Sequence, residues 1–95
     1  MAVVIRLTVA PATREQFDAL DDRVGKAMDA AGGPPARLMS HVVHPEGDGF
    51  VVSDVWRSEA EGVAYVDHTL RALITDVGLP DGQMQVAPVW SFARP

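Results

Sequence analysis

The segment from His41 to Trp56 holds the side chains of this chain that are best suited to acid–base chemistry. It reads HVVHPEGDGFVVSDVW, with His41 and Asp54 in apolar runs on either side of a turn-like middle. An imidazole beside a carboxylate can act as a general base, because the carboxylate fixes its tautomer and raises its basicity. We therefore take His41 and Asp54 as candidate catalytic residues that remove a proton from an acidic carbon or a phenol.

The length of the hairpin loop decides whether these two residues meet. A four-residue loop places His41 opposite Asp54, whereas a five-residue loop places Ser40 there, because a shift of one residue turns every side chain to the other face. The sequence leaves both registers open. It also leaves open a purely structural role, in which the two groups satisfy each other inside a filled interior, since an unpaired carboxylate among apolar residues is costly.

Three further residues are candidates for binding a substrate. Trp56 and Trp90 offer flat apolar walls suited to an aromatic or polycyclic ligand, although tryptophan on a sheet is commonly a core residue. Arg6, inside the first apolar segment, either meets an anionic ligand or pairs with an acid across the sheet. The histidines and carboxylates do not have the spacing of metal ligands, so no metal site is expected.

Apolar periodicity predicts the elements that position these residues. Alternating apolar residues predict strands at 2–10, 37–44, 50–57 and 84–92, and helical spacing predicts two helices that begin after Thr13 and Ser58. Each helix start has the pattern of a capping box, with Gln16 or Glu61 three residues on. Residues 45–49 are expected to form the hairpin loop. Pro88 lacks an N–H group, so the last strand is expected at a sheet edge.

The order βαββαβ is typical of an α+β, ferredoxin-like fold: a four-stranded antiparallel sheet with both helices on one face. Right-handed crossovers favour the spatial strand order 4-1-3-2. Several strands are apolar on both faces, and two helices can cover only one of them. We therefore expect the uncovered face to pack on a second copy of the chain, which makes a homodimer.

Composition bounds the remaining possibilities. The 95 residues make one domain, 1–95, with a net charge of −5 and a single lysine, so neither nucleic acid nor an anionic membrane is an expected partner. The chain has no cysteine. Its start has neither the charged leader nor the long apolar segment of a signal peptide, and a cytoplasmic protein is expected.

The strand that ends in DVWRSE, Asp54 to Glu59, and runs into an amphipathic helix resembles the dimeric α/β-barrel superfamily, which includes the antibiotic-biosynthesis-monooxygenase-like proteins. The longer segment from His41 is similar to small uncharacterised actinobacterial members. The resemblance implies an apolar pocket between sheet and helices in each subunit. Members include cofactor-independent quinone-forming oxygenases, haem-degrading oxygenases, lactone isomerases and cyclases.

The resemblance also places Trp56 where haem-degrading and some quinone-forming members have a pocket tryptophan. Those members use an asparagine as well, and this chain has none. His68 lies roughly where haem-degrading members carry an axial histidine, but it points away from the apolar stripe of its helix, which consists of Val63, Val66, Leu70, Leu73, Ile74 and Val77. Tyr65 also lies off this stripe, so its hydroxyl is expected to meet solvent or the dimer partner. These observations predict a homodimeric pocket protein that acts without a tightly bound cofactor, as a monooxygenase-like or isomerase- or cyclase-like enzyme, on a small aromatic or polyketide-like molecule. The alternative is a non-catalytic ligand-binding or structural dimer of the same fold.

Overall fold

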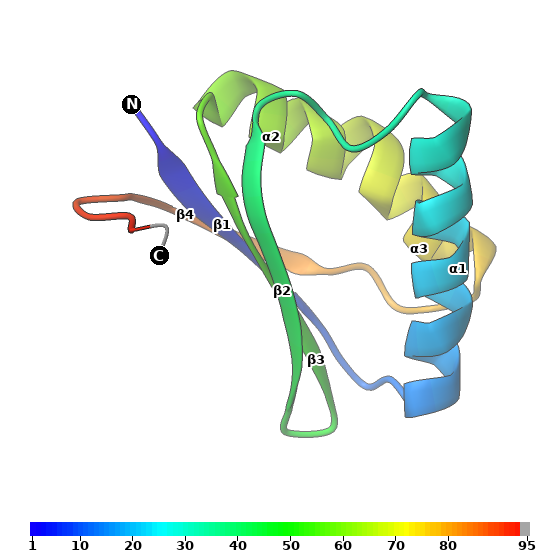
Figure 1. The fold of residues 1–95 in the computed structure, drawn as a ribbon. Coiled ribbons are helices and arrows are strands. Elements are labelled where there is room, and N and C mark those ends of the chain that lie inside the picture. Colours follow the sequence, from blue (N-terminus) through cyan, green and yellow to red (C-terminus); the bar gives the residue numbers. More distant parts are fainter. Residues whose placement is uncertain (94–95) are drawn as a thin grey trace.

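The structure, a computed structural model, describes residues 1–93 and has the predicted βαββαβ order (Figure 1). The second helix is made of three consecutive segments, one of them a π-helical turn. The elements are β1 (Val3–Val9), α1 (Arg14–Ala30), β2 (Leu38–Glu46), β3 (Gly49–Trp56), α2 (Glu59–Tyr65), η1 (Val66–Leu70), α3 (Arg71–Asp76) and β4 (Gln83–Pro88). Within residues 1–93, no helix combines the length and the apolar character that crossing a membrane requires.

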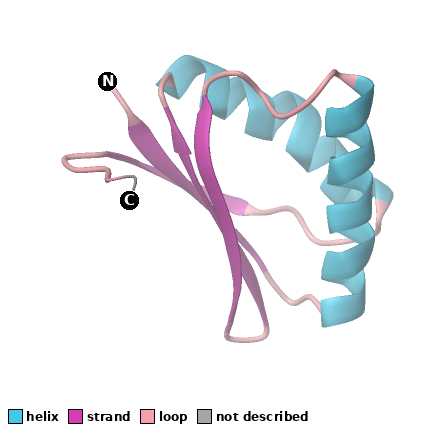
Figure 2. Cartoon of the chain, in the orientation of Figure 1, coloured by secondary structure: helices cyan, strands magenta, loops and turns pink. Residues whose placement is uncertain are grey.

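The four strands form one antiparallel sheet in the order β2-β3-β1-β4, which is the predicted order read from the other edge. All helical segments lie on one side of this sheet and leave its other side uncovered (Figure 2). β4 is an edge strand, as Pro88 predicted. The predicted ferredoxin-like fold is confirmed.

The β2–β3 hairpin is tighter than predicted. Its strands pair as far as Glu46 opposite Gly49, so the turn consists of Gly47 and Asp48 alone. Gly47 has a φ of 57°, which glycine adopts without steric cost and which suits the first position of a two-residue hairpin turn. Counting back from this turn places His41 opposite Asp54, and the register that the sequence left open is settled.

The helix starts confirm one capping box in full and the other in half. The backbone N–H of Gln16 donates to the Thr13 hydroxyl, and the Gln16 side chain accepts from the Thr13 N–H. The Ser58 hydroxyl likewise accepts from the Glu61 N–H. The Glu61 carboxylate instead lies 3.5 Å from Arg37, so it is drawn into an ion pair.

The predicted apolar stripe of the second helix packs on the core, and Gly62 extends its buried face. Gly62, Val66, Leu70 and Ile74 are buried at intervals of four residues, and this interval is maintained across the π-helical turn. A Cβ on Gly62 would lie 2.7 Å from both the Ile5 Cδ1 and the Trp56 Cγ atoms. Glycine at this position therefore allows the helix to approach the sheet closely.

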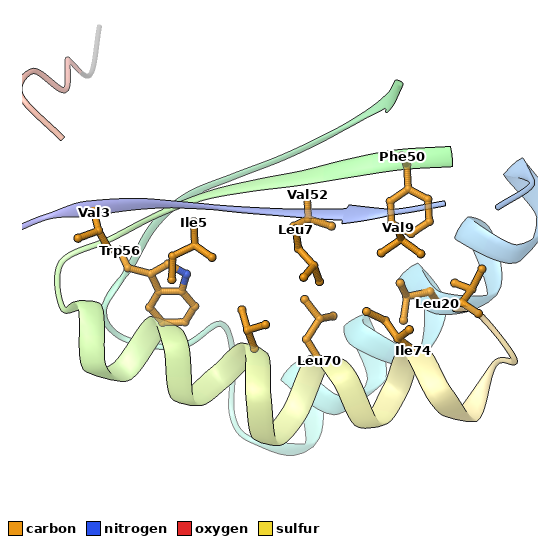
Figure 3. Packing of buried hydrophobic residues seen from close by; sticks show 12 residues of the cluster. Val3, Ile5, Leu7, Val9, Leu20, Phe50, Val52, Trp56, Leu70 and Ile74 are labelled. Carbon is orange, nitrogen blue, oxygen red and sulfur yellow. The ribbon is translucent and has the colours of Figure 1, made fainter. Parts of the chain in front are cut away.

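The core lies between the sheet and the helices. β1 contributes every second residue, from Val3 to Val9, and β3 contributes Phe50, Val52 and Trp56. In Figure 3 these side chains point from the strands toward Leu20 of α1 and toward Leu70 and Ile74 of the second helix. Burial of this apolar surface is the main stabilising contribution to the fold.

The uncovered face of the sheet presents the alternate residues of the same strands. Val4 pairs with Val55 on β3 and with Ala87 on β4, which makes an apolar row across three strands. Val42 of β2 is 56% exposed. The face is therefore partly apolar and open.

The last strand is shorter than predicted, because β4 ends at Pro88 and not at residue 92. Its neighbour β1 begins at Val3, and the Val89 N–H still donates to the Ala2 carbonyl. Beyond that bond no strand remains for the chain to pair with. Trp90 consequently lies outside the sheet and is 95% exposed.

Candidate functional site

His41 and Asp54 face each other on β2 and β3, on the side of the sheet that the helices cover. The His41 Nδ1 atom lies 2.6 Å from the Asp54 Oδ1 atom. The two side chains differ in burial: the carboxylate of Asp54 is 6% exposed and the imidazole of His41 is 42% exposed. A buried carboxylate is thus held by an imidazole whose other edge reaches solvent.

This geometry fixes the roles of the two ring nitrogens. An ionised carboxylate can only accept hydrogen bonds, so the Nδ1–H group donates to Asp54 and the Nε2 lone pair stays available. The hydrogen bond to Asp54 raises the pKa of His41 above its ordinary value of 6.5, and the charges of Asp54 and Asp21 act in the same direction. Partial burial of the ring opposes this shift.

A narrow cleft, here called the inner cleft, runs beside the pair between α1 and the β2–β3 strands. Its polar lining is Asp21, His41, Asp54 and Tyr65. The remaining lining side chains are apolar: Phe17, Leu20, Val24, Met28, Leu38, Val43, Val52 and Leu70. The free volume is about 20 Å³, enough for about one water molecule but not for an aromatic ring.

A wider depression, here called the outer hollow, adjoins the inner cleft at Phe17 and Val43, which line both. It lies between the start of α1 and the hairpin turn and has a volume of about 430 Å³. Besides Phe17 and Val43, it is bordered by residues 12–14, 44–45 and 47–50. A volume of this size lies within the usual range for small-molecule sites. A ring in the outer hollow would contact Phe17 and Val43, which also line the inner cleft.

Tyr65 was missed as a site residue. From its position off the predicted stripe, its hydroxyl was expected to meet solvent or a dimer partner. That expectation is wrong: the hydroxyl oxygen is buried and has no hydrogen-bond partner among residues 1–93. Tyr65 lies three residues after the buried Gly62, and it borders the inner cleft. Gly62, one turn earlier, was the available signal that this face approaches the sheet.

Trp56 is a core residue and does not line the inner cleft. It is 1% exposed, and its ring packs against Tyr65 with the ring centroids 5.4 Å apart. Its indole N–H has no hydrogen-bond partner among the described residues. Trp56 also borders a shallow groove together with Arg37, Glu61 and His68, which neither His41 nor Asp54 lines.

The structure does not bring Arg6 and Trp90 to the pair. Arg6 lies on the uncovered face, because it alternates with Ile5, which pairs with Asp54 on the helix side. Its guanidinium lies 3.6 Å from the Glu46 carboxylate, the ion pair that the sequence offered as one alternative. Trp90 lies beyond the end of β4. Within a single chain, neither residue can line the inner cleft.

The described residues offer no cluster of three or more His, Cys, Asp or Glu side chains that could hold a metal ion. The chemistry that the arrangement supports is proton transfer. His41 can accept a proton at Nε2, and Asp54 stabilises the imidazolium that forms. The apolar lining strengthens this interaction, because a low local dielectric weakens screening.

Comparisons with known proteins agree at the level of the fold. No protein-family model and no curated protein matches the chain. Among solved structures, it is similar to a dimeric ferredoxin-like protein of unknown function from Thermobifida fusca, with a TM-score of 0.64, 18% identity, and coverage of 94% of this chain and 92% of that one.

Two further structures connect the fold to oxygenases. A protein from Chloroflexus aurantiacus, provisionally assigned as an antibiotic biosynthesis monooxygenase, matches with a TM-score of 0.61 and 19% identity over 98% of both chains. SnoaB, a cofactor-independent oxygenase from Streptomyces nogalater, matches with a TM-score of 0.58 and 20% identity, covering 96% of this chain and 93% of that one. The chain thus has the ferredoxin-like fold that is also found in antibiotic-biosynthesis-monooxygenase-like proteins, as its sequence suggested.

Proposed function

We propose that this protein is a small homodimeric enzyme that uses the His41–Asp54 pair to remove a proton from an aromatic or polyketide-like small molecule, without a tightly bound cofactor. The observation that carries the proposal is the 2.6 Å contact between a buried carboxylate and a half-exposed imidazole at the edge of an apolar cleft. A pair of this kind orients a general base and stabilises its protonated form.

The proposed step begins with the substrate ring in the outer hollow and its acidic group at the inner cleft. The His41 Nε2 atom takes the proton, and the electron pair stays on the substrate as an enolate, a carbanion or a phenolate. Return of the proton to a different carbon completes an isomerisation. Attack of the enolate carbon on a carbonyl carbon of the same molecule, followed by return of the proton to the oxygen of that carbonyl, completes a cyclisation. Reaction of the anion with O₂ as a second substrate completes an oxygenation, the reaction class named for SnoaB.

The homodimer in this proposal forms through the uncovered face of the sheet. The apolar row of Val4, Val55 and Ala87 and the exposed Val42 lie on that face. The structurally similar protein from Thermobifida fusca is described as dimeric. Association of two such faces would bury apolar surface that a domain of this size cannot cover by itself.

The test follows hydrogen–deuterium exchange in 2-tetralone, an aromatic ketone with acidic C–H groups, by NMR in D₂O. The wild-type protein is expected to accelerate exchange. General-base catalysis typically contributes about 10²–10⁴-fold, so His41→Ala should lose most of the acceleration. His68→Gln, an exposed histidine outside the inner cleft, is the matched control. Equal exchange rates with wild-type protein and His41→Ala would reject the assignment of the base.

A second candidate function is a ligand-binding or structural dimer without catalysis. The small volume beside the pair, about 20 Å³, favours it, because the pair then serves mainly to satisfy a buried carboxylate. In that case, substitution of His41 lowers stability while no variant changes the exchange rate of any bound ketone. Measuring melting temperatures and exchange on the same proteins separates the two candidates.

A further inference from the structure

The Tyr65 hydroxyl is a buried polar group that has no role in the proton transfer to His41 proposed above. Its oxygen has no hydrogen-bond partner among residues 1–93, although buried hydroxyl groups are normally hydrogen-bonded. The ring is held in place by packing against Trp56. A rigidly held donor without an acceptor is thus present at the wall of the inner cleft.

The surroundings of Tyr65 keep its hydroxyl protonated. Burial raises the pKa of Tyr65 above its ordinary value of 10.0, and the negative charge of Asp54 adds to this effect. The titratable groups that share the inner cleft are Asp21 of α1, His41 of β2 and Asp54 of β3. On the other side of the ring, a shallow groove is lined by Arg37, Glu61 and His68. The hydroxyl therefore remains a hydrogen-bond donor near a carboxylate that is already bonded to His41.

The space that these groups enclose has the size of one polar group. The inner cleft holds about 20 Å³, which fits one water molecule or one ligand oxygen. The Nδ1 atom of His41 is already bonded to Asp54, so its Nε2 atom is the ring nitrogen left to meet a ligand. An oxygen placed there would lie in a cleft that both Tyr65 of α2, a donor, and His41 of β2, a base, line.

We propose that the Tyr65 hydroxyl donates a hydrogen bond to the substrate oxygen on which negative charge develops when His41 removes the proton. This inference rests on the proposed function and narrows its substrate class to phenols and to ketones with an acidic α-hydrogen. In the ketone case the C–H bond breaks, its proton moves to His41 Nε2, and its electron pair forms the enolate whose oxygen Tyr65 contacts. A donor placed at a developing oxyanion stabilises the transition state more than the ground state.

The test compares binding of 4-nitrophenol, under alkaline conditions where it is ionised, with binding of nitrobenzene, which lacks the oxygen. The absorbance of the ionised phenol reports its binding, and nitrobenzene is followed by competition. Tyr65→Phe keeps the ring that packs on Trp56 and removes only the hydroxyl. It should weaken binding of the ionised phenol by roughly 10–100-fold, the value of a hydrogen bond to a charged group, and leave nitrobenzene within about twofold.

Each alternative outcome has a distinct meaning. If Tyr65→Phe binds both probes as the wild type does, while His41→Ala still abolishes ketone exchange, the inference fails and the proposed function stands. The hydroxyl then holds a structural water. If neither probe binds saturably to the wild type, both the inference and the cleft as an aromatic site are rejected.

A second measurement covers the case in which Tyr65→Phe does not fold. In His41→Ala, where the base is absent, bound 4-nitrophenol should still ionise at a lower pH than the free probe, because the Tyr65 donor favours the anion. An ionisation midpoint equal to that of the free probe would overturn the inference. His68→Gln should match the wild type in both measurements.

Discussion

Replacing His41 by alanine removes the partner of the Asp54 carboxylate, and the cost can be derived from the unequal burial of the two groups. Asp54 is 6% exposed and His41 is 42% exposed. Loss of the imidazole therefore leaves a buried acceptor unpaired, whereas loss of the carboxylate leaves a ring that water can still reach. We expect His41→Ala to destabilise the fold more than Asp54→Asn does.

The expected magnitude lies between two limits. Breaking a fully buried ion pair costs about 3–5 kcal/mol, and leaving one buried polar group unsatisfied costs about 1–3 kcal/mol. The lower range applies here, because the space left by a half-exposed imidazole admits water to the carboxylate. For a domain of this length, about 1–3 kcal/mol lowers the melting temperature by roughly 5–20 °C.

The pH dependence provides a second, independent readout. The pKa of His41 is raised in the folded state, chiefly by the hydrogen bond to Asp54, relative to its ordinary 6.5. The folded state therefore binds more protons than the unfolded state above that pH. The stabilising contribution is complete below about 6.5 and is lost as the pH rises through the folded-state pKa. The gap between wild type and His41→Ala should narrow over this window.

The assay is thermal unfolding followed by circular dichroism at one protein concentration, from pH 5.5 to 9, with His68→Gln as the control. The concentration must be fixed because a dimer gains stability by mass action. A melting temperature of His41→Ala equal to that of the control at every pH would refute the reasoning. Asp54 would then not depend on His41, and the pair could not orient a base.

Three further predictions follow from other contacts. The rate of ketone exchange should rise as the pH rises through the raised pKa of His41, because only the neutral imidazole accepts a proton. The stabilising contribution of His41 falls over the same pH range. Asp54→Asn removes the carboxylate that raises this pKa and should move the midpoint of the rate increase to lower pH. Gly62→Ala places a methyl group 2.7 Å from the Ile5 Cδ1 and Trp56 Cγ atoms. Overpacking costs about 1–3 kcal/mol, and the higher helix propensity of alanine offsets about 1 kcal/mol of this cost. The free energy of unfolding, measured by denaturant titration, should therefore fall by up to about 2 kcal/mol. Val55→Glu places a charge on the uncovered face and should convert the proposed dimer to a monomer in sedimentation velocity, without loss of secondary structure; a dimer that persists would locate the interface elsewhere.

The order and pairing of the elements could be predicted because local signals and topology agree. The first helix begins at the capping box of Thr13 and Gln16, and Pro88 lies in an edge strand. The hairpin register could not be predicted, because a four-residue loop and a five-residue loop were both possible and they place opposite faces of β2 against β3. The positive φ of Gly47, which closes a two-residue turn, makes the choice.

The residues of the candidate site were predicted less completely than the fold. The sequence indicated His41 and Asp54 because both are polar residues within apolar strands. Tyr65 was missed because it lies off the apolar stripe of the second helix, and the buried face was not extended to Gly62, which lies three residues before it. The prediction for Trp90 depended on a last strand that reaches residue 92. The strand β4 ends at Pro88 instead, because its neighbour β1 begins at Val3 and offers no further residues to pair with.

Successive side chains of β3 point to opposite faces of the sheet, so the two faces can serve different functions. Asp54 points to the helices and the inner cleft, while its neighbour Val55 points to the uncovered face and pairs with Val4. A dimer formed through the uncovered face therefore leaves the inner cleft and the outer hollow open to ligands. The same interface would nevertheless pack against the uncovered face of β3 and so restrict the movement of the strand that carries Asp54. For this reason, a monomeric Val55→Glu variant should keep the 4-nitrophenol site but bind the probe more weakly, and it separates the contribution of the dimer from that of the cleft.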